Sequence, residues 1–316
     1  MSHARTPLPA PTPGATLDAA LADGLAALDA DGLRRTLRPL VRVAGATVRD
    51  ADGRTLVDFA SNDYLGLAAD PRPATAAAEA LAEGGVGAGA ARLISGDHPS
   101  HHALERALAA LKRAEDAVLF ASGWAANAGA IPALAGRDDA IYADALNHAS
   151  LIDGCRLSRA TVRVFPHNDV DALAGLLAED AGRFRRRWVV VEGVYSMDGD
   201  LCPLDRVTAV ARAHGAFVFL DDAHATGVIG PDGRGSAAHW KVEGAVDATV
   251  GTLGKALGTT GAFVAGSAAL AELLRHRARS FVFTTGTPPA MAAATLRALA
   301  VLHEEPGRRA RVRAVA

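Results

Sequence analysis

Short β-rich runs alternate with alanine- and leucine-rich stretches from about Ala117 onward, and this alternation constrains the fold more than any other feature. It predicts an α/β fold, in which a mostly parallel sheet is flanked by helices. Half of the 316 residues are apolar, which is enough for a sizeable core. The predicted helices span 124–134, 170–181, 204–214 and 268–278. The predicted strands are AVLFAS, AIYAD, TVRVFP, RWVVVEGVYS, AFVFLDDAH, ATVGTL and GAFVAG.

Polar residues follow most of these strands, at the edge where open α/β sheets bind their ligands. They occur in the five segments Ser122-Gly123, Asp144 to His148, Glu192 to Ser196, Asp221 to His224 and Thr252 to Lys255. We therefore expect the functional site at the carboxyl ends of the strands.

Charge and cysteine content exclude several classes of function. The formal net charge is -2, with 33 basic and 35 acidic residues, so the basic field that nucleic acid requires is missing. Cys155 and Cys202 lie far apart without metal-ligand spacing, which predicts no disulfide, no metal site and a reducing cytoplasm. The stretch Thr16 to Ala30 is interrupted by aspartates, so it predicts an amphipathic helix and no membrane span.

Two glycine motifs are decoys. GVGAGA at Gly85 to Ala90 fits a dinucleotide pattern, but it follows a helical stretch where that motif needs a strand. Gly254-Lys255 lacks the earlier glycine and the following Ser or Thr of a phosphate loop. Neither motif predicts a nucleotide site.

Lys255 stands among small residues in TVGTLGKALGTTGAF, after one β-rich run and before another. An exposed loop lysine is the default interpretation. However, a carbonyl cofactor such as pyridoxal phosphate (PLP) needs an amine in a confined site, and flanking glycines let its ring and phosphate approach the backbone. Lys255 is therefore the candidate Schiff-base residue.

Asp221 ends the apolar run AFVFLD. It fits a helix cap, but it also fits the carboxylate that keeps the pyridine nitrogen of PLP protonated. Asp222, next along the strand, should point to the opposite face. His224 is either a structural histidine or a partner for the phenolic oxygen of the cofactor or for the substrate.

Two further strand ends fit the same cofactor. Ser122-Gly123 opens a helix whose free N–H groups suit a phosphate, whereas Trp124 fits a core position equally well. His148 could stack on the cofactor ring, although helix capping by Asn147 and Ser150 explains this segment as well.

Together these segments resemble the α-oxoamine synthase family of PLP enzymes, which has the aspartate aminotransferase-like fold. Within it, HNDV and SMDGDLCPL resemble the member that condenses L-alanine with a pimeloyl thioester, from coenzyme A or a carrier protein, in biotin biosynthesis. A glycine C-acetyltransferase-type enzyme is the alternative. The resemblance covers SNDYLGL, RLISGDHPSHHALE, SGWAANAGAI, NHASLIDGCRLS, HNDV, VEGVYSMDGDLCPL, DDAHATGVIGPDGRGS, TLGKALGTTGAF and FTTGTPPA, from Ser61 to about Ala290.

The resemblance implies roles around the cofactor ring. Lys255 would bind PLP as a Schiff base and move protons, Asp221 would face the pyridinium nitrogen, and His148 would stack on the ring. His224 and Ser196 would bond the phenolic oxygen.

It also implies contacts at the phosphate. The amides of Gly123 and Trp124, together with Thr252, would hold it. Thr285 would reach the phosphate of a neighbouring subunit's cofactor, which predicts a homodimer. Glu192 corresponds to a carboxylate that the family keeps close to the site.

The resemblance further implies two substrate contacts and a domain plan. Asn62 would assist binding of the substrate carboxylate, and Arg34 would meet the distal carboxylate of the acyl chain. We predict four parts in the chain, which are a flexible leader (1–15), an N-terminal helix and small-domain segment (16–60), a PLP-binding domain (61–287) and the start of a C-terminal domain (288–316).

The family continues into a smaller C-terminal domain, which we expect to be largely missing here together with the arginine that holds the amino acid's carboxylate. A truncated PLP-binding pseudoenzyme is therefore a second alternative. A helix is predicted from Pro288 to His303, followed by a basic tail, RRARVRAVA, that should fray.

Overall fold

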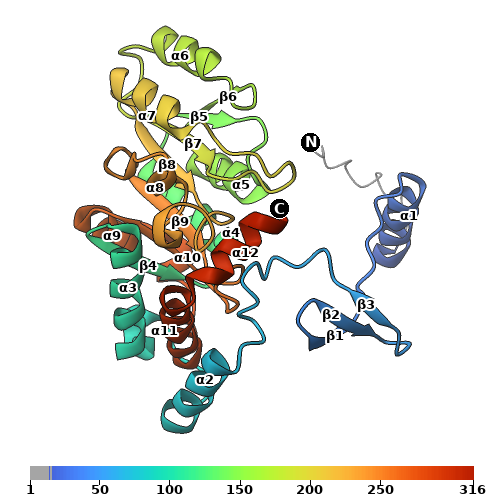
Figure 1. Ribbon diagram of the computed structural model, residues 1–316. Helices are drawn as coiled ribbons and strands as arrows, with labels where there is room; N and C mark the ends of the chain where they lie inside the picture. The colour runs from blue at the N-terminus through green and yellow to red at the C-terminus, as the bar shows by residue number, and fades with distance from the viewer. Residues whose placement is uncertain (1–13, 15) are drawn as a thin grey trace. The chain divides into compact units, whose positions relative to one another are not determined.

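The computed structural model describes Gly14 and residues 16–316 (Figure 1). The chain divides into two compact units, with the boundary between Phe59 and Ala60. Except for Gly14, the leader predicted over 1–15 lies outside the described residues. Residues 288–316 are grouped with the second unit. The boundary predicted at residue 287 stays a prediction.

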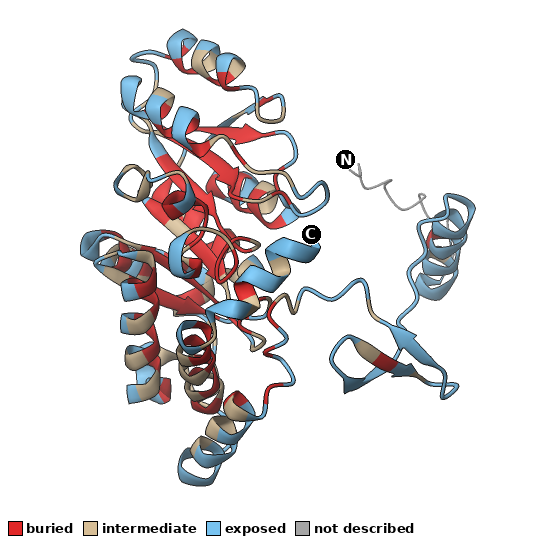
Figure 2. Ribbon diagram, in the orientation of Figure 1, coloured by how far each residue is buried: buried red, intermediate tan, exposed pale blue. Residues whose placement is uncertain are grey.

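The first unit contains helix α1 (Leu17–Ala30) and a three-stranded antiparallel sheet, with strands β1 (Leu40–Ala44), β2 (Thr47–Asp50) and β3 (Thr55–Val57). The helix begins where the Thr16 hydroxyl accepts a hydrogen bond from the Ala19 amide. Most of the first unit is exposed (Figure 2). Among its described residues, only Gly24 and Val48 are buried.

The second unit is built on a seven-stranded sheet, and all seven predicted strands are confirmed. The order is β4-β10-β9-β8-β7-β5-β6, and β10 alone runs in the direction opposite to the other six strands. A mostly parallel sheet is thus also confirmed. The strands are β4 (Asp116–Phe120), β5 (Ala140–Asp144), β6 (Thr161–Phe165), β7 (Arg187–Glu192), β8 (Phe217–Asp221), β9 (Ala248–Thr252) and β10 (Ala262–Gly266).

Helices cover both faces of this sheet, and the four helices predicted between or beside its strands are present as α4, α6, α7 and α9. The strands carry apolar side chains on both faces of the sheet, because helices bury both faces. The α-helices are α2 (Pro71–Gly84), α3 (Pro99–Lys112), α4 (Gly123–Leu134), α5 (Ala149–Ser158), α6 (Val170–Glu179), α7 (Leu204–Ala213), α8 (Ser236–His239), α9 (Ala268–Arg277), α10 (Arg279–Val282), α11 (Pro289–Glu304) and α12 (Pro306–Val315). Three short turns of other helix types are η1 (Arg92–Gly96), η2 (Pro231–Gly233) and η3 (Glu243–Ala245).

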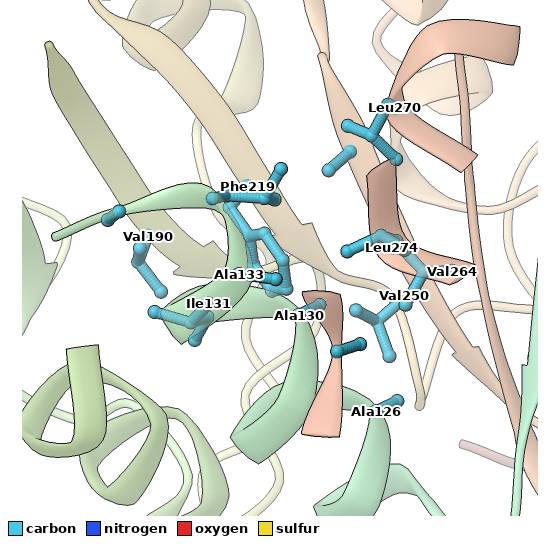
Figure 3. Packing of buried hydrophobic residues seen from close by; sticks show 14 of the residues in the cluster. Ala126, Ala130, Ile131, Ala133, Val190, Phe219, Val250, Val264, Leu270 and Leu274 are labelled. Atoms are coloured by element: carbon cyan, nitrogen blue, oxygen red, sulfur yellow. The ribbon is translucent and has the colours of Figure 1, made fainter. Parts of the chain in front are cut away.

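Successive residues of a strand pack alternately on the two faces of the sheet, and each face has its own core. Val190 packs on the face covered by α4 and α9, whereas Val189 and Val191 pack on the face covered by α6 and α7. Figure 3 shows the first face, where Ala126 and Ala130 of α4 lie against strand residues. Small residues allow this close approach, which fixes the start of α4 against the carboxyl ends of the strands.

The predicted fraying of the basic tail is wrong, because residues 306–315 form α12. Arg308 donates to the Leu65 carbonyl (2.7 Å) and to the Asp70 carboxylate (2.8 Å), and Arg309 donates to the Leu302 carbonyl (2.5 Å). These guanidinium groups donate hydrogen bonds to backbone carbonyls and so hold the helix in place. The composition of the tail does not reveal these contacts.

Replacing Arg308 with alanine should lower the free energy of unfolding by about 1–2 kcal/mol, because two hydrogen bonds to partly buried acceptors are lost. Arg311→Ala, on an exposed position of the same helix, should change it by less than about 0.5 kcal/mol. Urea denaturation of both variants measures the difference. Equal effects would show that α12 is not held by Arg308.

Candidate active site

Asp221 occupies the end of β8, where the register of the sheet pairs it with Glu192 of β7. Its carboxylate is buried and accepts hydrogen bonds from the Asn127 side-chain amide (2.7 Å) and the Ala223 amide (3.0 Å). Burial raises the pKa of Asp221, although these two hydrogen bonds and the charge of Lys255 oppose the shift. A buried carboxylate of this kind favours a cationic partner.

Asp222 has different partners from Asp221. Its carboxylate accepts hydrogen bonds from the Lys112 ammonium (2.6 Å) and from the Ser236 amide (3.1 Å), and all three residues are buried or nearly so. Asp222 therefore anchors the strand end, while Asp221 is directed toward α4.

Asn127 was not predicted from the sequence. It lies in α4, and its side-chain amide also donates to the Ser150 hydroxyl (2.9 Å). The only signal in the sequence is a buried amide within the otherwise apolar stretch AANAGAI. This residue connects Asp221 to the start of α5.

Lys255 follows β9, and its Nζ lies 2.8 Å from Nε2 of His224. Nδ1 of His224 lies 2.7 Å from the Tyr64 hydroxyl, which donates to the Asn62 side-chain oxygen (3.2 Å). The structure thus brings Asn62, His224 and Lys255 into one hydrogen-bonded chain. Tyr64 was missed, although it stands inside the quoted segment SNDYLGL.

Burial controls the protonation of this chain. It lowers the pKa of Lys255, while the charges of Asp221 and Glu192 act in the opposite direction. Burial, together with the charge of Lys255, lowers the pKa of His224 to about 4. His224 is therefore neutral at pH 7. The neutral form of the Lys255 amine is favoured more than in an ordinary lysine.

Glu192 and His148 meet at the neighbouring strand end. A Glu192 carboxyl oxygen accepts from the His148 amide (2.5 Å), and burial, with the nearby charge of Asp221, raises the pKa of Glu192 to about 8. The exposed His148 ring caps α5, since its Nδ1 accepts from the Ser150 amide (3.2 Å). Asn147 instead donates to the Val190 carbonyl (2.8 Å). The helix cap for which Asn147 and Ser150 were considered is therefore provided by His148.

Gly123 and Thr252 come together at the start of α4. A side chain at residue 123 would place its Cβ 2.9 Å from the Thr252 methyl group, so only glycine leaves this approach open. The Ser122 hydroxyl caps the helix by accepting from the Ala125 amide (3.1 Å). Trp124 is about half exposed and donates to Asp153 (3.3 Å), so it is not a core residue.

Three predicted residues are not brought into this cluster. Ser196 and Thr285 are exposed, the first in the turn after β7 and the second before α11. Arg34 belongs to the first unit, where its guanidinium lies 2.6 Å from the Asp29 carboxylate. Their roles stay predictions.

The clustered residues fit PLP. An amine with a lowered pKa suits its aldehyde, a buried carboxylate suits its ring nitrogen, and a helix start without a side chain suits its phosphate. In residues 16–316 no three His, Cys, Asp or Glu side chains are grouped so that they could hold a metal ion. No helix in that range is long and apolar enough to span a bilayer.

Known proteins with similar sequences and folds agree with this chemistry. Residues 54–316 match the family described as aminotransferase class I and II. The 8-amino-7-oxononanoate synthase of Anaeromyxobacter sp. (strain K) is 54% identical over 285 residues, which cover 90% of this chain and 71% of the relative.

Two solved structures have the same fold. A serine palmitoyltransferase variant from S. paucimobilis, with a bound PLP–myriocin aldimine, superposes with a TM-score of 0.85 at 33% identity, covering 92% of this chain and 73% of that one. The 8-amino-7-oxononanoate synthase of Francisella tularensis superposes with a TM-score of 0.71 at 30% identity, covering 81% and 72%. The predicted aspartate aminotransferase-like fold is confirmed.

Proposed function

The chain belongs to the class I and II aminotransferase family as a homologue of the 8-amino-7-oxononanoate synthases, and on that premise we propose that it condenses L-alanine with a pimeloyl thioester. The products would be 8-amino-7-oxononanoate, carbon dioxide and a free thiol. The observation that carries the proposal is the convergence of Lys255, Asp221 and His224 at adjacent strand ends.

Three parts of the site would hold PLP. Lys255 would bind its aldehyde carbon, Asp221 its ring nitrogen, and the backbone at Gly123, with Thr252, its phosphate. When bound, PLP supplies an electron sink for the carbanion chemistry at the α-carbon of alanine. Asp221 would keep a positive charge at the ring nitrogen, because a cationic partner stabilises its buried carboxylate.

Lys255 would act as the base that removes the α-proton of alanine and later returns a proton to the product. Burial lowers its pKa, which favours the neutral amine that can accept a proton. His224, neutral at pH 7, would orient Nζ through Nε2, while Tyr64 holds Nδ1 of the same ring. Asn62 fixes the Tyr64 hydroxyl and would also bond the substrate carboxylate.

Glu192 limits the negative charge in the site. Since its pKa is raised to about 8, it is mostly protonated at pH 7 and adds little negative charge beside Asp221. His148 would cover the face of the cofactor ring, with its orientation set by the Ser150 hydroxyl 2.7 Å from Nδ1. The roles of Ser196 at the phenolic oxygen and of Arg34 at the distal carboxylate rest on resemblance.

Exposed apolar side chains support a homodimer. Large apolar residues that remain in water often mark an interface between subunits. In such a dimer, Thr285 would reach the phosphate of the neighbouring subunit's cofactor. Such exposed residues include Leu93, Ile94, Trp124, Met197 and Phe283.

A substrate assay tests the proposed function. PLP-loaded protein is mixed with carboxyl-labelled L-alanine and pimeloyl-coenzyme A, and released thiol and labelled carbon dioxide are counted. We expect equal amounts of both, and little of either with glycine and acetyl-coenzyme A.

Preference for glycine and acetyl-coenzyme A would instead support a glycine C-acetyltransferase-type enzyme. A change in cofactor absorbance on adding alanine, without thiol release from pimeloyl-coenzyme A or from the carrier-protein thioester, would contradict the acyl-transfer proposal.

A further inference from the structure

His167, from the segment HNDV, lies between two carboxylates at the carboxyl edge of the sheet. Its Nδ1 is 2.9 Å from Oδ1 of Asp144, and its Nε2 is 2.8 Å from Oδ2 of Asp200. Carboxylates only accept hydrogen bonds, so a ring that bonds both of them must donate from both nitrogens. This arrangement selects the imidazolium form, since the Asn168 side-chain nitrogen, which lies 3.2 Å from Nε2, makes its shorter contact (2.7 Å) with Oδ2 of Asp200.

Asn168 reinforces the same pair of carboxylates. Its amide donates to Oδ2 of Asp144 (2.8 Å) and its side chain donates to Oδ2 of Asp200 (2.7 Å). Its φ of 55° lies in the left-handed region that asparagine tolerates better than most residues. We refer to Asp144, His167, Asn168 and Asp200 as the His167 cluster.

The His167 cluster connects two turns that carry predicted site residues. Asp144 shapes the turn leading to His148, because its Oδ1 accepts from the Leu146 amide (2.8 Å). Asp200 closes the turn that contains Ser196, where its carbonyl accepts from the Tyr195 amide (3.0 Å). An isolated bridge between Val194 and Leu201 forms the base of that turn.

We propose that His167 is a positioning residue, which holds the turn of Ser196 against the turn of His148 and so orders one wall of the active site. The importance of this wall for catalysis rests on the proposed function. The mechanical link between the turns depends only on the contacts of the His167 cluster.

The charges around His167 make this link dependent on pH. Burial alone would lower the pKa of His167, but the hydrogen bonds and charges of Asp144 and Asp200 outweigh it and raise the pKa. The link is therefore complete below the ordinary histidine pKa and is lost as the pH rises through the raised value.

The other titratable groups near His167 are Tyr195, whose ring meets it edge-on at 4.4 Å, and then Cys202 and Glu192 beside Asp144. Burial raises the pKa of both Tyr195 and Cys202, so neither ionises near neutral pH. Glu192, with a pKa of about 8, also titrates above the ordinary histidine pKa, so a variant is required to separate its effect from that of His167.

Hydrogen exchange across a pH series tests the proposal in the full-length chain. After correction for intrinsic exchange, we expect the hydrogen-bonded amides of Tyr195 and Gly199 to exchange about tenfold faster in His167→Gln than in the parent at a pH below the ordinary histidine pKa. The parent should lose its protection as the pH rises through the raised pKa of His167, whereas His167→Gln should show no such step. His276→Gln is the matched control, because His276 is exposed and contacts Glu272 on its own helix.

Equal exchange in the parent and in His167→Gln, or a step that persists in that variant, would overturn the proposal. A proton NMR titration of His167 in the parent gives a second test that does not depend on folding of the variant. We expect its pKa to lie above the ordinary value and to fall in Asp200→Asn, and an ordinary or lower value in the parent would overturn the proposal.

These measurements need neither cofactor nor substrate, so they separate this proposal from the proposed function. In PLP-loaded protein, we expect His167→Gln to lower kcat about tenfold, while His276→Gln leaves it unchanged. Faster exchange in His167→Gln with unchanged kcat would retain the link between the turns but overturn its role in the active site. Absence of PLP binding in the parent would contradict the proposed function alone.

Discussion

Lys255→Ala should abolish covalent binding of PLP and lower kcat/KM for alanine by at least about 10⁴-fold. The substitution removes both the amine that binds the cofactor and the base that moves the α-proton. No other amine replaces it, because the chain has only two further lysines, and Lys112 is paired with Asp222.

Lys241→Ala is the matched control for this prediction. Lys241 is exposed, so its loss should leave both the absorbance of bound PLP and kcat/KM unchanged. The two variants are compared by steady-state thiol release and by the visible spectrum. An active Lys255→Ala protein with a PLP spectrum like that of the parent would contradict the assignment of Lys255.

Asp221→Asn should affect catalysis and Asp222→Asn should affect stability, although the two residues are adjacent. Asp221→Asn should lower kcat about 10²- to 10³-fold, because the charge that stabilises the protonated ring nitrogen is lost. It should not lower the stability of the cofactor-free protein, since burial already disfavours this carboxylate.

Asp222→Asn should instead lower the free energy of unfolding by about 3–5 kcal/mol, because it leaves the buried ammonium of Lys112 without its ion-pair partner. Where the variant remains folded, its PLP spectrum should resemble that of the parent. Denaturation curves and cofactor spectra of both variants separate the effects. A loss of stability in Asp221→Asn with normal activity would reverse the two roles.

The strands of the second unit could be predicted from the sequence because each is a short apolar run bounded by polar residues. Both faces of a covered sheet are buried, so the runs are nearly continuous and easy to recognise. For the same reason, the strand ends that carry Asp221 and Lys255 could be located before the structure was known.

The partners of these residues could not be predicted, because they come from distant parts of the chain. Asn127 reaches Asp221 across 94 positions, and Tyr64 reaches His224 across 160. Neither residue type is itself a catalytic signal. Their importance follows from packing of α4 and of the SNDYLGL segment against the strand ends, which periodicity does not reveal.

The capping of α5 and the helical tail show two other limits. His148 was considered for cofactor stacking, yet its ring also caps α5. The sequence did not indicate this second, structural role. The tail RRARVRAVA has few apolar residues, but Arg308 and Arg309 bind carbonyl groups that only the folded chain presents. Composition describes a segment without its neighbours.

Locating the bound cofactor shows whether Lys255 is the PLP-binding amine of this site. The protein is loaded with PLP, reduced with sodium borohydride, digested and analysed by mass spectrometry. We expect one modified peptide, carrying the pyridoxyl group on Lys255. Modification of Lys112 or Lys241 with Lys255 unmodified, or no modified peptide, would contradict this expectation.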